Sequence, residues 1–87
     1  MSASARRRLW KAQGGLCYYC AKPTRFVIYP PGHTPRKRDA TLDHVIPKSL
    51  GGVNAPRKNC VMACLQCNHE RGTKDARLFL LEKMGLA

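Results

Sequence analysis

The sequence predicts a small α+β domain that is held together by a bound metal ion. Two observations support this prediction. The cysteines recur as two C-x-x-C pairs, Cys17/Cys20 and Cys64/Cys67, and the chain has only 87 residues, near the lower limit at which a hydrophobic core alone gives comfortable stability. A C-x-x-C turn directs both sulfurs at one ion, so four such thiolates suit a tetrahedral structural zinc. We expect a single domain over residues 1–87.

The cellular setting favours zinc over disulfide bonds. Residues 1–8 lack the apolar stretch of a signal peptide, and no segment approaches transmembrane length. We therefore expect a soluble, cytoplasmic protein, in which thiols stay reduced and bind metal. A redox-active pair of cysteines is the alternative interpretation. The fifth cysteine, Cys60, lies in an apolar run and is expected in the core.

The N-terminal part of the chain, residues 1–15, predicts a basic helix over residues 3–13. Ser4 is a candidate N-cap, Leu9 and Trp10 supply apolar anchors, and Gly14 with Gly15 ends the helix. Residues 16–77 then form the zinc-clamped core. The first part of this core is the cysteine turn 17–20, followed by a short strand over residues 26–29, which are β-branched and aromatic.

The middle of the chain predicts a hairpin with long connections. Residues 30–39 contain three prolines and one glycine, which indicates a mobile surface loop. Residues 41–46 resemble a strand that Pro47 ends, residues 50–54 are turn-rich, and residues 59–63 are a plausible partner strand. From Asn68 one helix is expected to run to Met84, with Leu78, Leu81 and Met84 on its apolar face, so that residues 78–87 hold its end.

The charge of the chain points to a polyanionic partner. Sixteen Lys and Arg against five Asp and Glu give a formal net charge of +11. The cations lie in clusters, and clustered cations that displace counterions from phosphates give affinity without sequence information. No segment combines a basic face with a broad apolar one, so a membrane surface is not the expected partner. The candidate nucleic-acid contacts are Arg6, Arg7, Arg8, Arg36, Lys37, Arg38, Arg71 and Lys74.

A further set of polar residues lies between and beside the cysteine pairs. The string DHVIPKSLGG begins at Asp43, Asn59 follows it, and CLQCNHERGTKD begins at Cys64. Together these segments resemble the pattern of the HNH endonucleases, over roughly residues 14–77. The resemblance implies the ββα-metal (His-Me finger) fold, stabilised here by the four cysteines and preceded by an N-terminal helix.

The resemblance also implies roles for particular residues. In the family, the Asp before the His is a metal ligand, the His is the general base, the middle Asn orients the loop that bears the base, and the last Asn or His is a second ligand. At matching positions these are Asp43, His44, Asn59 and Asn68, with His69 as the alternative ligand. The implied substrate is DNA, expected to be double-stranded, and cleavage is expected to leave a 5′ phosphate.

The residues themselves suit phosphodiester hydrolysis. A base must deprotonate water, and a cation must neutralise charge that builds on the phosphate and on the leaving oxygen. The imidazole of His44 can accept a proton near neutral pH. The Asp43 carboxylate and the Asn68 amide oxygen are hard ligands that suit Mg²⁺ or Mn²⁺. Adjacent residues of a regular strand point to opposite faces, so Asp43 and His44 can serve one site only if the strand bends or ends there.

The sequence therefore predicts a metal-dependent DNA endonuclease with a structural zinc and a catalytic Mg²⁺ or Mn²⁺ ion. A zinc-stapled nucleic-acid-binding module without catalysis is the alternative, since the charge and the cysteines would suffice for it. From the family resemblance we expect the protein to occur in a bacterial or phage-infected host cell. A packaging or mobile-element complex would supply a partner protein there. Sequence preference and oligomeric state are not encoded in any visible pattern.

Overall fold

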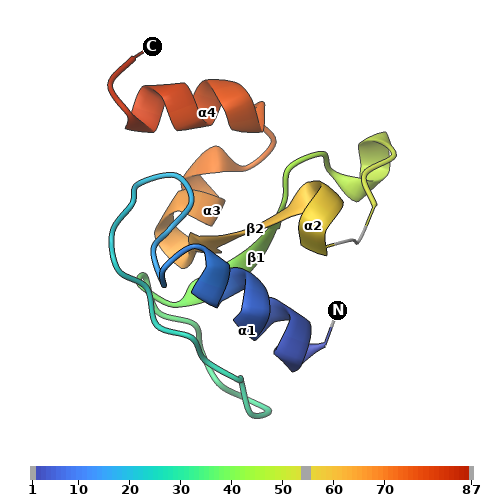
Figure 1. Cartoon of the computed structure of the whole chain (residues 1–87), viewed down its shortest axis with the longest axis vertical. Helices are drawn as coiled ribbons and strands as arrows, with labels where there is room; N and C mark the ends of the chain where they lie inside the picture. The colour runs from blue at the N-terminus through green and yellow to red at the C-terminus, as the bar shows by residue number, and fades with distance from the viewer. Residues whose placement is uncertain (1, 54–55, 87) are drawn as a thin grey trace.

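The computed structural model of the protein describes residues 2–53 and 56–86, and its centre is a two-stranded antiparallel sheet. Strand β1 spans Ala40–His44 and strand β2 spans Cys60–Cys64, in a register that pairs Ala40 with Cys64 and His44 with Cys60. Figure 1 shows the helices arranged around this hairpin. Both predicted strands and their antiparallel pairing are confirmed, with ends shifted by one or two residues.

Helix α1 (Ala3–Ala12) covers the outer edge of β2, and the predicted helix over residues 3–13 is confirmed. Its N-cap is Ser2, not Ser4, because the Ser2 side chain accepts a hydrogen bond from the Ala5 N–H. At the other end, the Gln13 amide donates to the Met62 carbonyl and accepts from the Met62 N–H, both at 2.8 Å. Gln13 thus gives an acceptor to the Met62 N–H on the outer edge of β2, while the Met62 carbonyl also accepts from the Tyr18 N–H.

The segment between the first cysteine pair and β1 forms no strand, so the strand predicted over residues 26–29 is wrong. Its backbone makes isolated bridges, Leu16 to Pro23 and Arg25 to Asp39, and its aromatic residues serve side-chain contacts instead. Asp39 is fully buried and accepts hydrogen bonds from the Arg25 guanidinium, the Tyr29 hydroxyl and the Arg36 N–H. These bonds keep the pKa of Asp39 below its usual value, the Arg36 N–H contributing most, against the opposing effect of burial.

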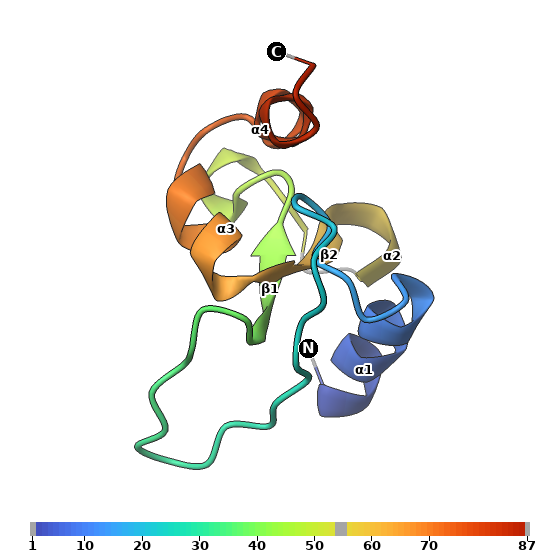
Figure 2. The same cartoon turned by 90° about the vertical axis from the view of Figure 1, so that its left-hand side faces the viewer.

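The basic loop over residues 25–39 therefore has a defined shape, although it contains no regular secondary structure beyond the bridge between Arg25 and Asp39. Figures 1 and 2 show it projecting at the end of the molecule opposite helix α4 (Ala76–Lys83). Its C-terminal end also contacts helix α3 (Leu65–Arg71), where the Asp39 and Lys37 carbonyls accept from the N–H groups of Leu65 and Gln66. These are N–H groups of the first helical turn, which have no partner inside the helix.

The C-terminal region forms two helices, so the single helix predicted from Asn68 to Met84 is wrong. Helix α3 ends at Arg71 because Gly72 adopts φ 52° and ψ −117°, which cannot continue a helix. Asp75 then caps α4 by accepting hydrogen bonds from the N–H groups of Arg77 and Leu78. The break rotates α4 so that Ala76 and Phe79 are buried, whereas Leu78 and Met84 are more than half exposed.

The core lies between the cysteine pairs, the sheet and α4. Tyr19, Ala63 and Phe79 are buried with the cysteines, and the Tyr19 and Phe79 rings meet edge to face with centroids 5.0 Å apart. Cys60 is buried in β2, as predicted. The shorter connections include a one-turn helix η1 (Lys48–Leu50) and helix α2 (Pro56–Asn59); position 54 of the predicted turn lies outside the described residues. None of the helices described has the length and apolarity needed to span a membrane.

The double hydrogen bond between Gln13 and Met62 predicts a measurable loss of stability when the amide is removed. Gln13→Ala leaves the N–H of buried Met62 without this acceptor, which should lower the free energy of unfolding by about 1–3 kcal/mol. Urea titration of the zinc-loaded protein measures this loss of unfolding free energy. Gln66→Ala is the matched control, since that exposed side chain bonds only to exposed Glu70. Equal losses in the two variants would contradict the assignment.

Candidate active site and metal centre

Four cysteine sulfurs meet at one point of the core. The Sγ atoms of Cys17, Cys20, Cys64 and Cys67 all lie within 4.8 Å of one another. A zinc ion with Zn–S bonds of about 2.3 Å would place its four sulfurs about 3.8 Å apart, and the Cys20 and Cys64 sulfurs are separated by 4.0 Å. The donor set and its dimensions fit a tetrahedral zinc site with four thiolate ligands. Among the described residues, this is the one group of three or more His, Cys, Asp or Glu positioned to hold an ion.

Backbone N–H groups point at the same sulfurs. The Tyr19 N–H lies 3.4 Å from the Cys17 sulfur, and the Cys67 N–H lies 3.4 Å from the Cys64 sulfur. Each bond closes the tight turn of its own pair. Cys64 ends β2 and caps α3, with Cys67 in the first turn of that helix. The second pair therefore joins the sheet and α3 at the metal site.

Burial makes four thiolates costly unless a cation compensates them. Burial raises the pKa of the Cys17 and Cys67 thiols, whereas hydrogen bonds from Cys67 and Arg38 outweigh burial and lower the pKa of Cys64. Arg38 was expected to contact nucleic acid. Its guanidinium instead donates to the Cys64 sulfur at 2.7 Å and lies 3.7 Å from the Cys20 sulfur, where it offsets the negative charge of a zinc-bound thiolate cluster.

A second polar group surrounds Asp43, the fourth residue of β1. Asp43 is buried, and its carboxylate accepts a hydrogen bond from the Tyr19 hydroxyl. Arg71, the last residue of α3, is also buried, and its Nη1 lies 2.7 Å from each carboxylate oxygen. Burial, together with the neighbouring carboxylate, raises the pKa of Tyr19, so its hydroxyl keeps its proton and acts as the donor.

The strand turns aside immediately after His44. Arg71 donates to the carbonyl of His44 at 3.0 Å and to that of Val45 at 2.7 Å. Consecutive carbonyls of an extended strand point to opposite edges, so one guanidinium can bind both only where the backbone bends. β1 ends at His44, and residues 45 and 46 form a bend. The strand thus ends directly at His44, while Asp43 and His44 themselves are still paired with β2.

Asn59 holds the next residue of this segment. Its Oδ1 accepts from the Ile46 N–H at 2.7 Å, and its Nδ2 donates to the Ile46 carbonyl at 2.9 Å and to the Val53 carbonyl at 3.0 Å. The Asn59 carbonyl also accepts from the Val45 N–H. Asn59 thus bonds to both residues of the bend that follows His44, which is the geometry that the sequence resemblance assigns to the middle Asn.

Gly52 fits beneath the same bend. A Cβ atom at this position would lie 1.8 Å from the Ile46 carbonyl oxygen and 2.8 Å from Asn59 Nδ2. Only a residue without a side chain allows this close approach of two backbone segments. The adjacent Gly51 has φ +90° with nothing within 4 Å of its Cβ position, so it is required by conformation and not by space.

The candidate metal ligands Asp43 and Asn68 share one side of β1. The Asn68 amide of α3 donates to the Thr41 hydroxyl at 2.9 Å and to the Leu42 carbonyl at 3.3 Å. Thr41 and Asp43, two residues apart, project from the same face of the strand. Asn68 and Arg71 lie one helical turn apart and both contact β1, whereas His69 is exposed on another face of α3. Asn68 is therefore better placed than His69 to act with Asp43.

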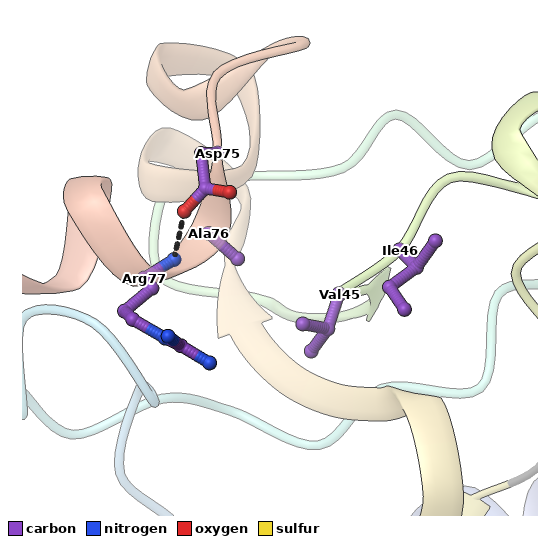
Figure 3. Close-up of a pocket in the computed structure, with 5 residues that line it drawn as sticks. All are labelled: Val45, Ile46, Asp75, Ala76 and Arg77. Carbon is purple, nitrogen blue, oxygen red and sulfur yellow. Dashed lines mark hydrogen bonds between the residues drawn. The ribbon is translucent and has the colours of Figure 1, made fainter.

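A solvent-open groove borders this segment. It has a volume of about 370 Å³ and is lined by Val45, Ile46, Asp75, Ala76 and Arg77. In Figure 3 the start of α4 with Arg77 faces the segment that carries Val45 and Ile46 across this space. The two residues that follow His44 are thus accessible from solvent on one side, while Arg71 and Asn59 hold their backbone on the other.

The predicted nucleic-acid contacts separate into exposed and internal cations. Arg38 and Arg71 are engaged with the cysteine sulfurs and with Asp43, and Arg6 is half-buried in α1. Arg7 lies over the Phe26 ring at 5.0 Å yet remains exposed. The cations of the predicted set that face solvent are Arg7, Arg8, Arg36, Lys37 and Lys74.

The sequence pattern of the HNH endonuclease family matches residues 17–74, two-thirds of the chain. The chain belongs to the HNH endonuclease family. This assignment agrees with the hairpin, the following helix and the four-cysteine cluster, which together form the expected zinc-clamped ββα-metal fold. Neither the curated proteins nor the solved structures contain a match to this chain.

Sequence reasoning missed two residues of the HNH site. Tyr19 was not among the candidate site residues, and Arg71 was a candidate nucleic-acid contact, but both bond to Asp43. The only sequence signal for this arrangement was the scarcity of acidic residues among so many cations. A buried carboxylate needs a partner, but the identity of the partner depends on the fold.

The contact between Arg38 and the thiolates predicts an effect on zinc retention. Arg38→Ala should release zinc to a chromogenic chelator about 10-fold faster, since outer-shell partners of a metal site typically contribute 10- to 100-fold. Lys37→Ala removes the same charge from an exposed neighbour and is the control. Identical release rates would show that Arg38 does not stabilise the bound ion.

The close approach of Gly52 to the bend predicts a specific response to a methyl group. Gly52→Ala should lower the free energy of unfolding by about 3 kcal/mol because the Ile46 carbonyl and Asn59 must move. It should also speed hydrogen exchange of the Ile46 amide. Gly51→Ala, which introduces only backbone strain of about 1–2 kcal/mol, should leave that amide protected. Exchange measured by NMR distinguishes the two, and protection of Ile46 in both variants would refute the steric account.

Proposed function

We propose that the protein is a divalent-metal-dependent DNA endonuclease in which His44 is the general base. The observation that supports this most is the fixed bend at the end of β1, where hydrogen bonds hold the backbone of residues 44–46 from two sides. General-base catalysis requires a side chain held in register with its substrate. A module that only bound phosphates would not need this bracing.

His44 is half-buried at the last position of β1, which suits a group that must meet both protein and solvent. In the proposed reaction its imidazole takes a proton from water, and that water attacks the phosphorus in line with the departing 3′ oxygen. The departing 3′ oxygen takes up a proton from solvent and His44 later releases its own, so the products are a 3′ hydroxyl and a 5′ phosphate. The segment after His44 borders the open groove between β1 and α4, which gives the substrate a path of approach.

A catalytic Mg²⁺ or Mn²⁺ ion fits the donor set, with Asp43 and Asn68 as its ligands. A carboxylate has about four acceptor positions. The described contacts use one on Oδ1 and two on Oδ2, so Oδ1 retains capacity for a ligand bond. The Asn68 amide nitrogen faces β1 through its two hydrogen bonds and leaves the amide oxygen as the ligand atom. When bound, the ion neutralises negative charge on the phosphate and on the leaving oxygen.

Double-stranded DNA is the proposed substrate. The exposed cations of the basic loop and of α1 supply affinity for phosphate without selecting bases, since phosphate contacts position a protein on a duplex but carry no sequence information. Trp10 links these two elements, because its ring packs against Phe26 and its Nε1 donates to Thr24 at 2.8 Å. The two basic segments therefore act as one surface.

The role of His44 predicts a selective loss of cleavage. His44→Ala should lower the rate of plasmid cleavage in Mg²⁺ or Mn²⁺ by about a hundred- to ten-thousand-fold, while zinc content and DNA affinity stay unchanged. His33→Ala, a change in the basic loop, is the histidine control, and EDTA should abolish cleavage by the parent protein. Undiminished cleavage by His44→Ala would remove His44 from the mechanism.

The same assay addresses the alternative of a non-catalytic module. Plasmid binding without nicking, in either metal and over a range of pH, would favour a zinc-stapled nucleic-acid-binding protein. Thiols that titrate freely with no stoichiometric zinc would instead favour a redox dithiol protein.

A further inference from the structure

We infer that Arg71 is the positioning residue for the catalytic segment, and that it acts through the backbone of His44 and Val45 and not through the phosphate. This inference rests on the proposed function for its catalytic consequence. Its structural basis is independent of that function, because it concerns hydrogen bonds within the protein.

The guanidinium of Arg71 is the hub of five contacts. Nε donates to the Lys74 carbonyl at 3.0 Å, Nη1 contacts both Asp43 oxygens and the His44 carbonyl, and Nη2 donates to the Val45 carbonyl at 2.7 Å. One planar group thus joins the end of β1, the bend after it and the turn between α3 and α4. A lysine, with a single nitrogen, cannot span these acceptors.

The burial of Arg71 excludes the expected phosphate contact. The residue is 3% exposed, and each of its three nitrogen atoms already has an acceptor in the protein. An Arg that served phosphate would need free donors directed at solvent. The internal partners therefore engage every nitrogen of the side chain, and the exposed Lys74 remains the nearby cation for the substrate.

Stability alone is a poor explanation for this buried pair. Replacing a buried ion pair by apolar residues of similar volume is often neutral or stabilising, because desolvation of both charges offsets their attraction. What apolar residues cannot supply is a fixed direction for the carbonyls of two consecutive residues. The pair instead fixes one geometry at the position where β1 must bend and present His44.

Asn59 completes the brace from the opposite side of the chain. It bonds to the N–H of Val45 through its carbonyl and to both backbone groups of Ile46 through its amide. Arg71 holds the carbonyls of residues 44 and 45, so the two residues divide the backbone of 44–46 between them. If either residue is removed, the bend remains attached at both ends, but its backbone no longer has one defined conformation.

The test compares Arg71→Lys with Gln13→Ala. The lysine keeps the charge and loses the multiple contacts, whereas Gln13→Ala removes hydrogen bonds to the Met62 backbone on the edge of β2 that does not face β1. We expect Arg71→Lys to lower kcat for plasmid nicking about 10- to 100-fold with KM within about twofold, and to retain one zinc per chain. Gln13→Ala should lower the melting temperature while kcat stays at the parent value.

Chemical rescue adds a second activity readout. Arg71→Ala should regain part of its kcat on addition of guanidinium at a concentration that leaves the parent and Gln13→Ala enzymes unchanged, with NaCl of equal ionic strength as control. If Arg71→Ala fails to fold, Arg71→Lys alone decides the matter. A rise in KM with unchanged kcat would overturn the inference, since it would show that Arg71 contacts the substrate.

Hydrogen exchange separates this inference from the proposed function. In Arg71→Lys the amides of Val45 and Ile46 should exchange faster, while those of β2 remain protected. This result supports the positioning role even if the parent protein shows no cleavage, in which case the proposed function fails alone. Unchanged exchange at Val45 and Ile46 would overturn the positioning role whatever the activity.

Discussion

The structure depends on a charge constraint at the four cysteines. Their sulfurs lie within 4.8 Å of one another, and three of the four residues are buried. Four thiolates so close cannot stay ionised without a cation, and four neutral thiols would lose the bonding that holds their turns together. Because Cys64 ends β2 and caps α3, an ion at this site sets the angle between the sheet and the helix that carries Asn68 and Arg71. An ion bound by the four cysteines would thus hold in place the elements that carry the candidate active site.

The basic residues have two roles: some bond to groups of the protein itself, and others remain available to phosphate. Asp39 and Asp43 are buried, and each is held by an arginine, Arg25 and Arg71, while Arg38 faces the thiolates. Each of these arginines makes several directed hydrogen bonds and so fixes a segment that lacks regular secondary structure. The net charge of +11 therefore overstates the cations available to phosphate. Exposed cations of the described residues lie on α1, the basic loop and the α3–α4 turn, and also at Lys22, Lys58, Arg77 and Lys83.

The hairpin, the N-terminal helix and the four-cysteine cluster were predictable because each depends on local pattern or on spacing. The break between α3 and α4 was not, because the apolar spacing of Leu78 and Met84 resembles one continuous face, and only the conformation of Gly72 shows that the helix ends. The strand predicted at residues 26–29 failed for a different reason. Strand propensity describes side chains that fit a pleated surface, and here the aromatic residues pack on Trp10 and bond to Asp39 instead.

The surroundings of Asp43 show why site residues are harder to predict than the elements that bear them. From the sequence, Asp43 and His44 are neighbours that a regular strand would direct to opposite faces. In the structure β1 ends at His44, and two side chains from distant parts of the chain, Arg71 and Asn59, hold the bend that follows it. Arg71 can bind both the carboxylate and the following carbonyls only because the backbone bends, and the bend persists because Arg71 binds them. Contacts that depend on each other in this way leave no periodic pattern and no local motif in the sequence. The family pattern indicates which residues meet there, but the contacts that hold them in place come from the tertiary structure.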